Sequence, residues 1–219
     1  TAYRWDIIGS ILGTLGFTLV AFLRAPSWVW PVVTLALLWA LYGRALPWVS
    51  RIAMVAIIGA LAFESLSAGV SWSPYYKVHT ETHNAGTAQE FTTIQVNGIP
   101  HQNVLDISER LKFEPVYGRP YERAVDNPLR NVLVVGAGTG SDVALALRNG
   151  AQHVDAVEID PRIMQIGEQI NPNHPYDDPR VDVHINDGRA FLSGTDTKYD
   201  LILFALPDSL TLVSGASQL

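Results

Sequence analysis

The chain has 219 residues and a net charge of −6, with 48% hydrophobic and only 16% charged residues. The negative balance excludes a protein that binds nucleic acid through a bulk basic surface. There is no cysteine, which excludes disulfides and thiolate metal sites. We therefore expect no nucleic-acid partner and no metal cofactor.

Charged residues are almost missing from the N-terminal third. An average soluble domain has roughly 25% of them, yet between Ile7 and Ala68 only four residues are charged: Arg24, Arg44, Arg51 and Glu64. Three apolar runs fill this region, at Ile7–Leu23, Trp28–Tyr42 and Ile52–Ala68. Tryptophans stand near the ends of the runs, as is typical of membrane interfaces. We predict that residues 1–70 form a transmembrane helical region of about three spans, belonging to a larger bundle, with membrane lipid as a partner.

The alternative is a set of buried helices in a soluble core. Three consecutive runs with almost no polar face are difficult to cover in a chain of this length, so membrane spans are favoured. No basic segment or small-residue cleavage site precedes the first run, which argues against a signal peptide. Arginine and lysine are divided almost evenly between the two sides of the spans, so the charge pattern does not fix the topology.

Residues 71–127 are predicted to be a small β unit followed by a connector. The segments Tyr76–Thr80 and Phe91–Val96 are rich in β-branched and aromatic residues, and Asn97-Gly98 is typical of a tight hairpin turn. Residues from Ser108 to Asn127 carry several prolines and are expected to connect this unit to the next domain.

Residues 128–219 alternate between strand and helix patterns. Strands are predicted at Asn131–Val135, Val154–Glu158, Val181–Ile185 and Leu201–Ala205. Ser141 and Asp160 are expected to cap the helices that follow the first two strands. This order predicts an α/β fold with a Rossmann-like parallel sheet of the methyltransferase type, truncated after the fourth strand, and we expect further strands beyond Leu219.

Functional side chains are expected at the carboxyl ends of these strands. The first strand runs directly into Gly136-Ala-Gly138-Thr-Gly140, a turn whose missing side chains allow a ligand to approach the backbone at a helix start. Glu158 ends the second strand, where a carboxylate can accept hydrogen bonds from two ribose hydroxyls. Asp187 follows the third strand and precedes Gly188. It could accept a hydrogen bond from an adenine amino group or cap the next helix, and both roles can coexist.

The sequence after Gly140 departs from the GxGxxG pattern of dinucleotide sites. This favours adenosylmethionine or its decarboxylated form as the bound nucleoside. The predicted binding residues are Gly136, Gly138, Thr139, Gly140, Glu158, Asp187, Gly188 and Tyr76.

Several stretches in this order resemble the spermidine synthase family of polyamine aminopropyltransferases, in its membrane-fused bacterial form. The resemblance covers residues 73–219 and is carried by seven stretches: Ser73–Val78, Asn97-Gly98, Val132–Gly140, Val157–Asp160, Asp178–Val181, Asn186–Ala190 and Tyr199–Ile202. It implies that Glu158 binds ribose and Asp187 binds adenine. It also implies a transferase that moves an aminopropyl group to an amine acceptor of the putrescine or spermidine class.

The amine-handling half of the family's site differs here. The family has two acids after the fourth strand, which fall on Ala205 and Asp208, so the acid regarded as the base is absent. The acid usual in the glycine turn is Thr139, and the glutamine usual in the first β strand is Tyr76. Asp208 is the matching candidate base, with Tyr117 and Tyr121 as candidate helpers.

Two other functions fit the same residues. Thr139 in the glycine turn is also typical of methyltransferases that use adenosylmethionine, and loss of the base at Ala205 fits a non-catalytic nucleoside sensor coupled to a membrane bundle. The nucleotide domain is expected on the cytoplasmic face of a bacterial inner membrane, where adenosylmethionine is made. A homodimer is left open.

Overall fold

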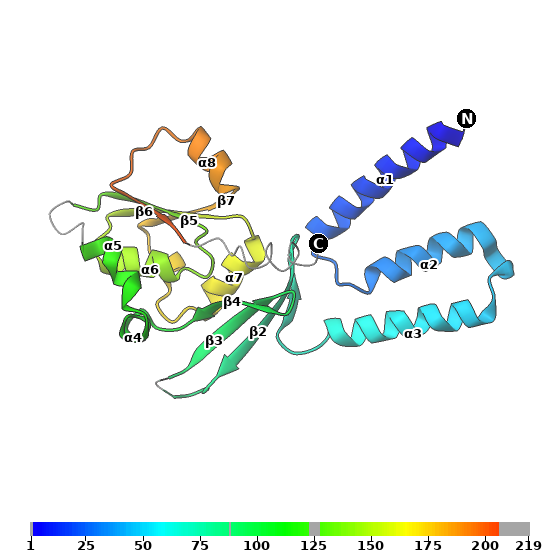
Figure 1. The fold of residues 1–219 in the computed structure, drawn as a ribbon, viewed down its shortest axis with the longest axis horizontal. Helices are drawn as coiled ribbons and strands as arrows, with labels where there is room; N and C mark the ends of the chain where they lie inside the picture. Colours follow the sequence, from blue (N-terminus) through cyan, green and yellow to red (C-terminus); the bar gives the residue numbers. More distant parts are fainter. Residues whose placement is uncertain (1, 88, 123–127, 206–219) are drawn as a thin grey trace, which may run out of the picture. The chain divides into compact units, whose positions relative to one another are not determined.

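The computed structural model describes residues 2–87, 89–122 and 128–205, without the side chain of Arg44. The chain divides into two compact units, Thr1–His79 and Thr80–Leu219. Figure 1 shows the helices of the first unit and the sheets and helices that follow them.

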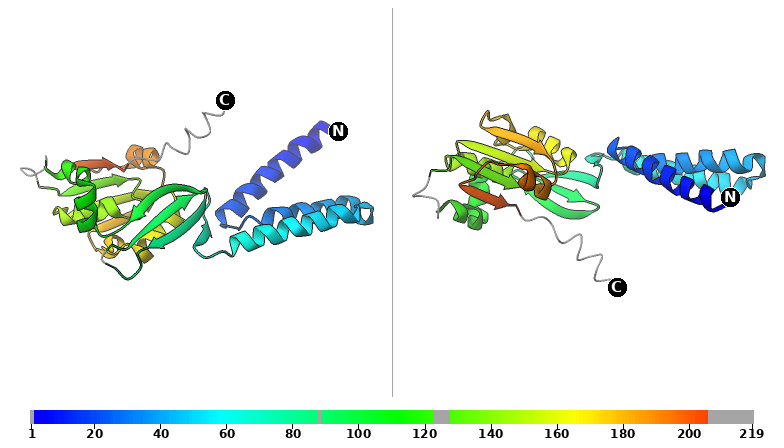
Figure 2. Two further views of the ribbon diagram at one scale, coloured as in Figure 1. Left: turned by 60° about the horizontal axis from the view of Figure 1, so that its bottom comes forward. Right: turned by 90° about the horizontal axis from the view of Figure 1, so that it is seen from above.

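The first unit begins with three helices: α1 (Ala2–Phe22), α2 (Val29–Tyr42) and α3 (Trp48–Ser65). A single 3-10 turn, η1 (Gly43–Ala45), joins α2 to α3, and these two helices run alongside each other (Figure 2). None of the three has a buried residue, and many of their exposed side chains are large and apolar. The three apolar runs are therefore helical, as predicted.

Two of these helices, α1 and α3, are long and apolar enough to cross a membrane. The 14 residues of α2 are fewer than the roughly 17 that a spanning helix needs. Glu64, near the end of α3, forms an ion pair with Lys77, so the acid closest to the apolar segment has a basic partner.

A four-stranded sheet has the order β1-β2-β3-β4. Its strands are β1 (Val70–Trp72), β2 (Lys77–His83), β3 (Phe91–Val96) and β4 (Ile99–Val104). Asn97 and Gly98 have φ angles of 51° and 81°, which is the geometry of the predicted hairpin turn. The short strand β1 was not predicted, because it directly follows the last apolar run without any alternating pattern.

The segment predicted as a connector is helical where the structure describes it. It contains α4 (Ile107–Phe113), the 3-10 turn η2 (Pro115–Gly118) and α5 (Arg119–Glu122). Asp106 caps α4 by accepting a hydrogen bond from the Ser108 amide. No helix was predicted for this connector, although its prolines stand at helix starts, where their missing N–H costs nothing.

The second sheet is parallel and has the order β7-β6-β5-β8. Its strands are β5 (Asn131–Val135), β6 (His153–Glu158), β7 (Val181–Ile185) and β8 (Leu201–Phe204). The crossovers contain α6 (Ser141–Arg148), α7 (Pro161–Ile170), the 3-10 turn η3 (Pro175–Asp177) and α8 (Gly188–Gly194). This confirms the predicted βαβαβαβ order and the parallel strands.

The prediction that Ser141 caps α6 was wrong. Gly140 occupies the cap with a left-handed φ of 90°, and the Ser141 hydroxyl is buried with no hydrogen-bond partner among the described residues. Asp160 does cap α7, accepting from the Arg162 amide at 2.8 Å. Four consecutive residues of α6, Val143, Ala144, Leu145 and Ala146, are buried, so this helix is packed on more than one side.

Candidate functional site

The predicted binding residues of the second unit lie together at one edge of the parallel sheet. Because all four strands point the same way, their carboxyl ends meet at this edge. The glycine turn follows β5, Glu158 ends β6, Asp187 follows β7 and Ala205 follows β8. The topology thus brings together residues separated by up to 69 positions in the sequence.

The glycine turn folds back tightly on its neighbours. The amides of Gly136 and Ala137 both donate to the carbonyl oxygen of Val157, at 2.9 and 3.0 Å. Gly138 has a φ of 56°, and a Cβ atom there would lie 2.9 Å from Oε1 of Gln102. The left-handed backbone conformation therefore favours glycine at this position, and any larger residue would also displace the end of the Gln102 side chain.

Glu158 is a buried acid at this edge, with 7% of its surface exposed. Its Oε2 accepts from the Gly138 amide at 2.8 Å and its Oε1 from the Asp160 amide at 2.8 Å. Burial raises the pKa of this carboxyl above its usual value, although these amide hydrogen bonds oppose the rise. A carboxylate has about four acceptor positions, so about two remain for a ligand.

Asp187 is exposed and caps α8. Its Oδ1 accepts from the amides of Arg189 and Ala190 at 2.9 and 3.0 Å, which is the capping role considered from the sequence. A Cβ atom on Gly188 would lie 2.4 Å from Cγ1 of Val135. Gly188 therefore has a packing role between α8 and β5 that is independent of any ligand.

Two residues not predicted from the sequence also contact the glycine turn. Gln102, on β4, accepts from the Thr139 hydroxyl at 2.9 Å, and Thr139 is fully buried. The Tyr176 hydroxyl donates to the carbonyl oxygen of Gly138 at 2.8 Å. Gln102 and Tyr176 lie 37 and 38 positions from their partners, and no local pattern in the sequence indicates such distant contacts.

The residues predicted to handle the amine are not all placed at this edge. Tyr121 is 6% exposed and belongs to the hydrophobic core, and burial raises the pKa of its hydroxyl. Tyr117 packs against the core beneath the guanidinium of Arg110, 4.9 Å from the ring centre. Asp208 lies outside the described residues. Tyr76, predicted among the nucleoside-binding residues, belongs to the first unit. The predicted binding residues of the second unit therefore lie at one sheet edge, whereas Tyr117 and Tyr121 pack in or against the core.

The sequence of this region matches known proteins. The spermine/spermidine synthase domain matches residues 122–215. A polyamine aminopropyltransferase of Lachnoclostridium phytofermentans is 36% identical over 95 residues, which cover 42% of this chain and 34% of that protein. Residues 122–215 thus carry a spermidine synthase-like domain. The family predicted from the sequence is therefore confirmed.

Other members of the spermidine synthase-like family match more of the chain at lower identity. A polyamine aminopropyltransferase of Korarchaeum cryptofilum is 25% identical over 136 residues, covering 59% of this chain and 42% of that protein. A crystal structure of a probable spermidine synthase from Corynebacterium glutamicum has a TM-score of 0.49 at 18% identity and covers 64% of this chain and 52% of its own. The chain spans about a third to two fifths of the length of these two curated relatives.

Proposed function

We propose that the carboxyl edge of the parallel sheet binds decarboxylated adenosylmethionine and that the protein transfers its aminopropyl group to an amine of the putrescine or spermidine class. The observation that carries this proposal is the buried carboxylate of Glu158 against the glycine turn. The match of residues 122–215 to a spermine/spermidine synthase domain supports the reaction class.

In this proposal the two unused acceptor positions of Glu158 receive the ribose hydroxyls. Hydrogen bonds to an ionised acceptor are about twice as strong as those between neutral groups, and the carboxylate is already fixed in place by two backbone amides. Asp187 keeps its Oδ1 on the helix amides and offers the carboxylate's other acceptor positions to the adenine amino group.

The transfer joins the acceptor nitrogen to the propyl carbon that is bonded to the sulfonium. The carbon–sulfur bond breaks, its electron pair remains on sulfur, methylthioadenosine leaves, and the attacking amine loses one proton. A carboxylate beside the amine would take that proton. Asp208 is the candidate base, and Tyr117 is a proposed helper. Tyr121 belongs to the buried core, so it is a weaker candidate helper than the sequence suggested.

A methyltransferase that uses adenosylmethionine itself is the second candidate. Its supporting observation is that two positions that hold an acid in the spermidine synthase family lack one here: Thr139 is buried against Gln102, and Ala205 follows β8. Methyl transfer can proceed chiefly by positioning, with no required base. A protein that only senses the nucleoside would show binding by the same residues without any product.

We also propose that α1 and α3 cross a bacterial inner membrane and that the nucleotide domain lies on its cytoplasmic face. The length and apolar surfaces of these two helices support the spans, and the cytosolic origin of the nucleoside supports the side. A reporter fused after Leu219 should be active only in the cytoplasm; activity only in the periplasm would contradict this orientation.

Calorimetric titration of the intact protein with both nucleosides separates the candidates. Aminopropyl transfer requires tighter binding of decarboxylated adenosylmethionine, because the site must accept an aminopropyl chain without a carboxylate. Tighter binding of adenosylmethionine would favour the methyltransferase. If neither nucleoside binds, the proposed site is wrong.

A further inference from the structure

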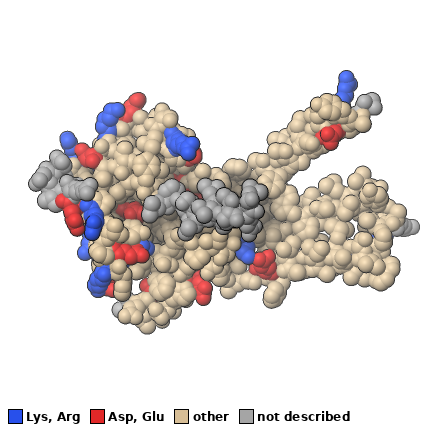
Figure 3. Space-filling model, in the orientation of Figure 1, with Lys and Arg blue, Asp and Glu red and all other residues tan. Residues whose placement is uncertain are grey.

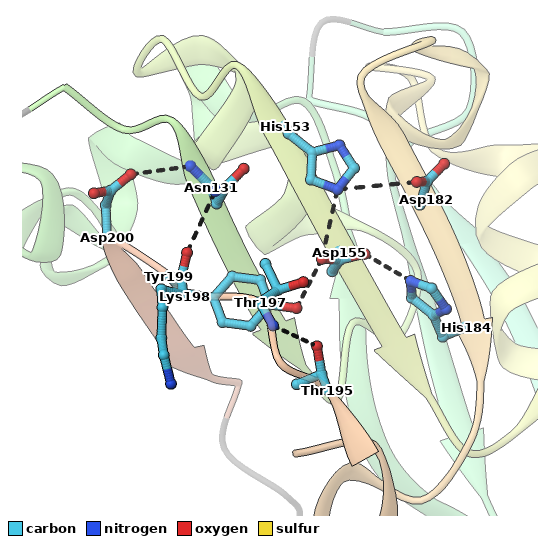
Figure 4. A network of polar contacts seen from close by, with 10 residues as sticks. All are labelled: Asn131, His153, Asp155, Asp182, His184, Thr195, Thr197, Lys198, Tyr199 and Asp200. Carbon is cyan, nitrogen blue, oxygen red and sulfur yellow. Dashed lines mark hydrogen bonds and ion pairs between the residues drawn. The ribbon is translucent and has the colours of Figure 1, made fainter. Parts of the chain in front are cut away.

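A second polar cluster lies on the parallel sheet, away from the site described above. His153 and Asp155 are two residues apart on β6, so their side chains point to the same face. Asp182 and His184 have the same spacing on β7, and Asp155 is the register partner of Asp182. Figure 4 shows these four side chains gathered over the two strands.

Three of the side chains have the geometry of a metal site. The Nε2 atom of His153 lies 3.5 Å from Oδ2 of Asp155 and 3.9 Å from Oδ2 of Asp182. One ligand atom from each of the three lies within 4.8 Å of the others. Two ligands at about 2.1 Å from a tetrahedral zinc ion are about 3.4 Å apart. A small movement of the exposed Asp182 side chain would therefore bring all three ligand atoms within bonding distance of one ion.

The central carboxylate is held in position by further hydrogen bonds. Asp155 is 7% exposed. Its Oδ1 lies 2.7 Å from Nε2 of His184, and its Oδ2 accepts from the Tyr199 hydroxyl at 2.8 Å. In metal sites, carboxylate ligands are held in position by hydrogen bonds from neighbouring groups. His184 in turn packs against the ring of Phe191, with the ring centres 4.6 Å apart.

The loop that carries Tyr199 is itself anchored to the sheet. The Asp200 carboxylate accepts from the amides of Arg130 and Asn131 at 2.8 and 3.0 Å, and the Asn131 side chain donates to the Lys198 carbonyl oxygen at 3.3 Å (Figure 4). Tyr199 is therefore held against Asp155 by contacts that do not depend on an ion.

We infer that His153, Asp155 and Asp182 bind a divalent transition-metal ion of the zinc class, with Asp155 oriented by His184 and Tyr199. Imidazole together with carboxylate oxygen suits zinc, and three protein ligands leave one position open. His153 and Glu158 are the first and last residues of β6, which places His153 roughly 16 Å and Asp155 roughly 10 Å along the strand from Glu158. The inference does not depend on the proposed function, and an ion here would stabilise the sheet rather than take part in transfer.

Calorimetric titration of zinc into tag-free, chelator-treated protein tests this inference. We expect one ion per chain. The substitution His153→Asn should weaken binding by at least about 100-fold, since losing even an orienting partner typically costs 10–100-fold. The matched control is His174→Asn, because His174 forms an exposed pair with Asp177 at 3.5 Å outside the cluster. This control should bind zinc as the wild type does.

A second pair of variants covers the case in which His153→Asn fails to fold. The Asp182 side chain is 68% exposed, so Asp182→Asn should fold normally and still weaken zinc binding at least tenfold, with Asp177→Asn as its control. The cobalt-loaded wild type should show the absorption of a tetrahedral ion, and the two cluster variants should lose it. Absence of zinc binding by the wild type, or equal affinity in the cluster and control variants, would overturn the inference.

Discussion

Replacing Glu158 by glutamine should separate ligand recognition from fold stability. In the folded protein this carboxylate accepts from the amides of Gly138 and Asp160, both at 2.8 Å. A glutamine presents one oxygen and one NH2 group, so one of these amides would face a donor. An unsatisfied buried donor costs about 1–3 kcal/mol of unfolding free energy, which domains of ordinary stability tolerate.

The effect on ligand binding should be larger than the loss of one ordinary hydrogen bond. Hydrogen bonds to a charged acceptor contribute about 1.5–3 kcal/mol each, and two are proposed to the ribose. Even with partial replacement by water, we expect affinity for any adenosyl nucleoside to fall by at least about tenfold, which corresponds to about 1.4 kcal/mol. Calorimetric titration measures the affinity, and thermal melting measures the cost to the fold.

The matched control is Glu168→Gln, because Glu168 is an exposed acid on α7 and its substitution should change neither quantity. If Glu158→Gln folds and binds the nucleoside with an unchanged dissociation constant, this carboxylate only supports the glycine turn and the reasoning fails.

Nucleoside affinity should also depend on pH through Glu158. Burial raises its pKa above the usual 4.5, and only the ionised form offers all its acceptor positions. Affinity should therefore fall as the pH is lowered through this raised pKa. Fold stability should change in the opposite sense, because a raised pKa means that the folded state binds this proton more tightly than the unfolded chain. Titrations at several pH values check the first effect, and a flat profile in the wild type would contradict it.

Three further predictions concern transfer, packing and the membrane. Ala205→Asp should raise the rate on putrescine or spermidine by about 10²–10⁴-fold, the usual contribution of a positioned base; robust transfer by the wild type would instead show that another residue, such as Asp208, already serves. Gly188→Ala should lower the free energy of unfolding by about 1–3 kcal/mol, because the added Cβ would lie 2.4 Å from Cγ1 of Val135. The control is Gly194→Ala, whose Cβ would meet nothing within 4 Å. Equal melting temperatures for the two variants would refute the packing role. After carbonate extraction the protein should remain with the membranes, and its release into the soluble fraction would count against spans by α1 and α3.

The parts of the fold that the sequence predicted well are those with strong local signals. The continuous apolar run of β5 followed by a glycine turn, the Asp160-Pro161 helix start and the Asn97-Gly98 hairpin each depend on neighbouring residues alone. The space-filling view in Figure 3 shows the same contrast as the sequence, with few charged side chains over the N-terminal helices and many over the second unit. These features follow from backbone conformation and solvation, which act within a few residues.

The features that the sequence did not reveal depend on distant contacts. Serine is a residue type that often caps helices, but the cap of α6 is Gly140, in a left-handed conformation, and not Ser141. Gln102 contacts Thr139 only because β4 is brought to the glycine turn. The expectation of no metal was based on the lack of cysteine. It did not anticipate that the register of β6 and β7 would bring His153, Asp155 and Asp182 together.

Aminopropyl transfer is tested most directly by product analysis. The intact protein would be incubated with decarboxylated adenosylmethionine and either putrescine or spermidine, and the nucleoside and amine products would be separated and quantified. The proposed function predicts methylthioadenosine and the lengthened polyamine in equal amounts, formed slowly because Ala205 replaces the usual acid. No product from either amine, together with tighter binding of adenosylmethionine than of its decarboxylated form, would contradict it.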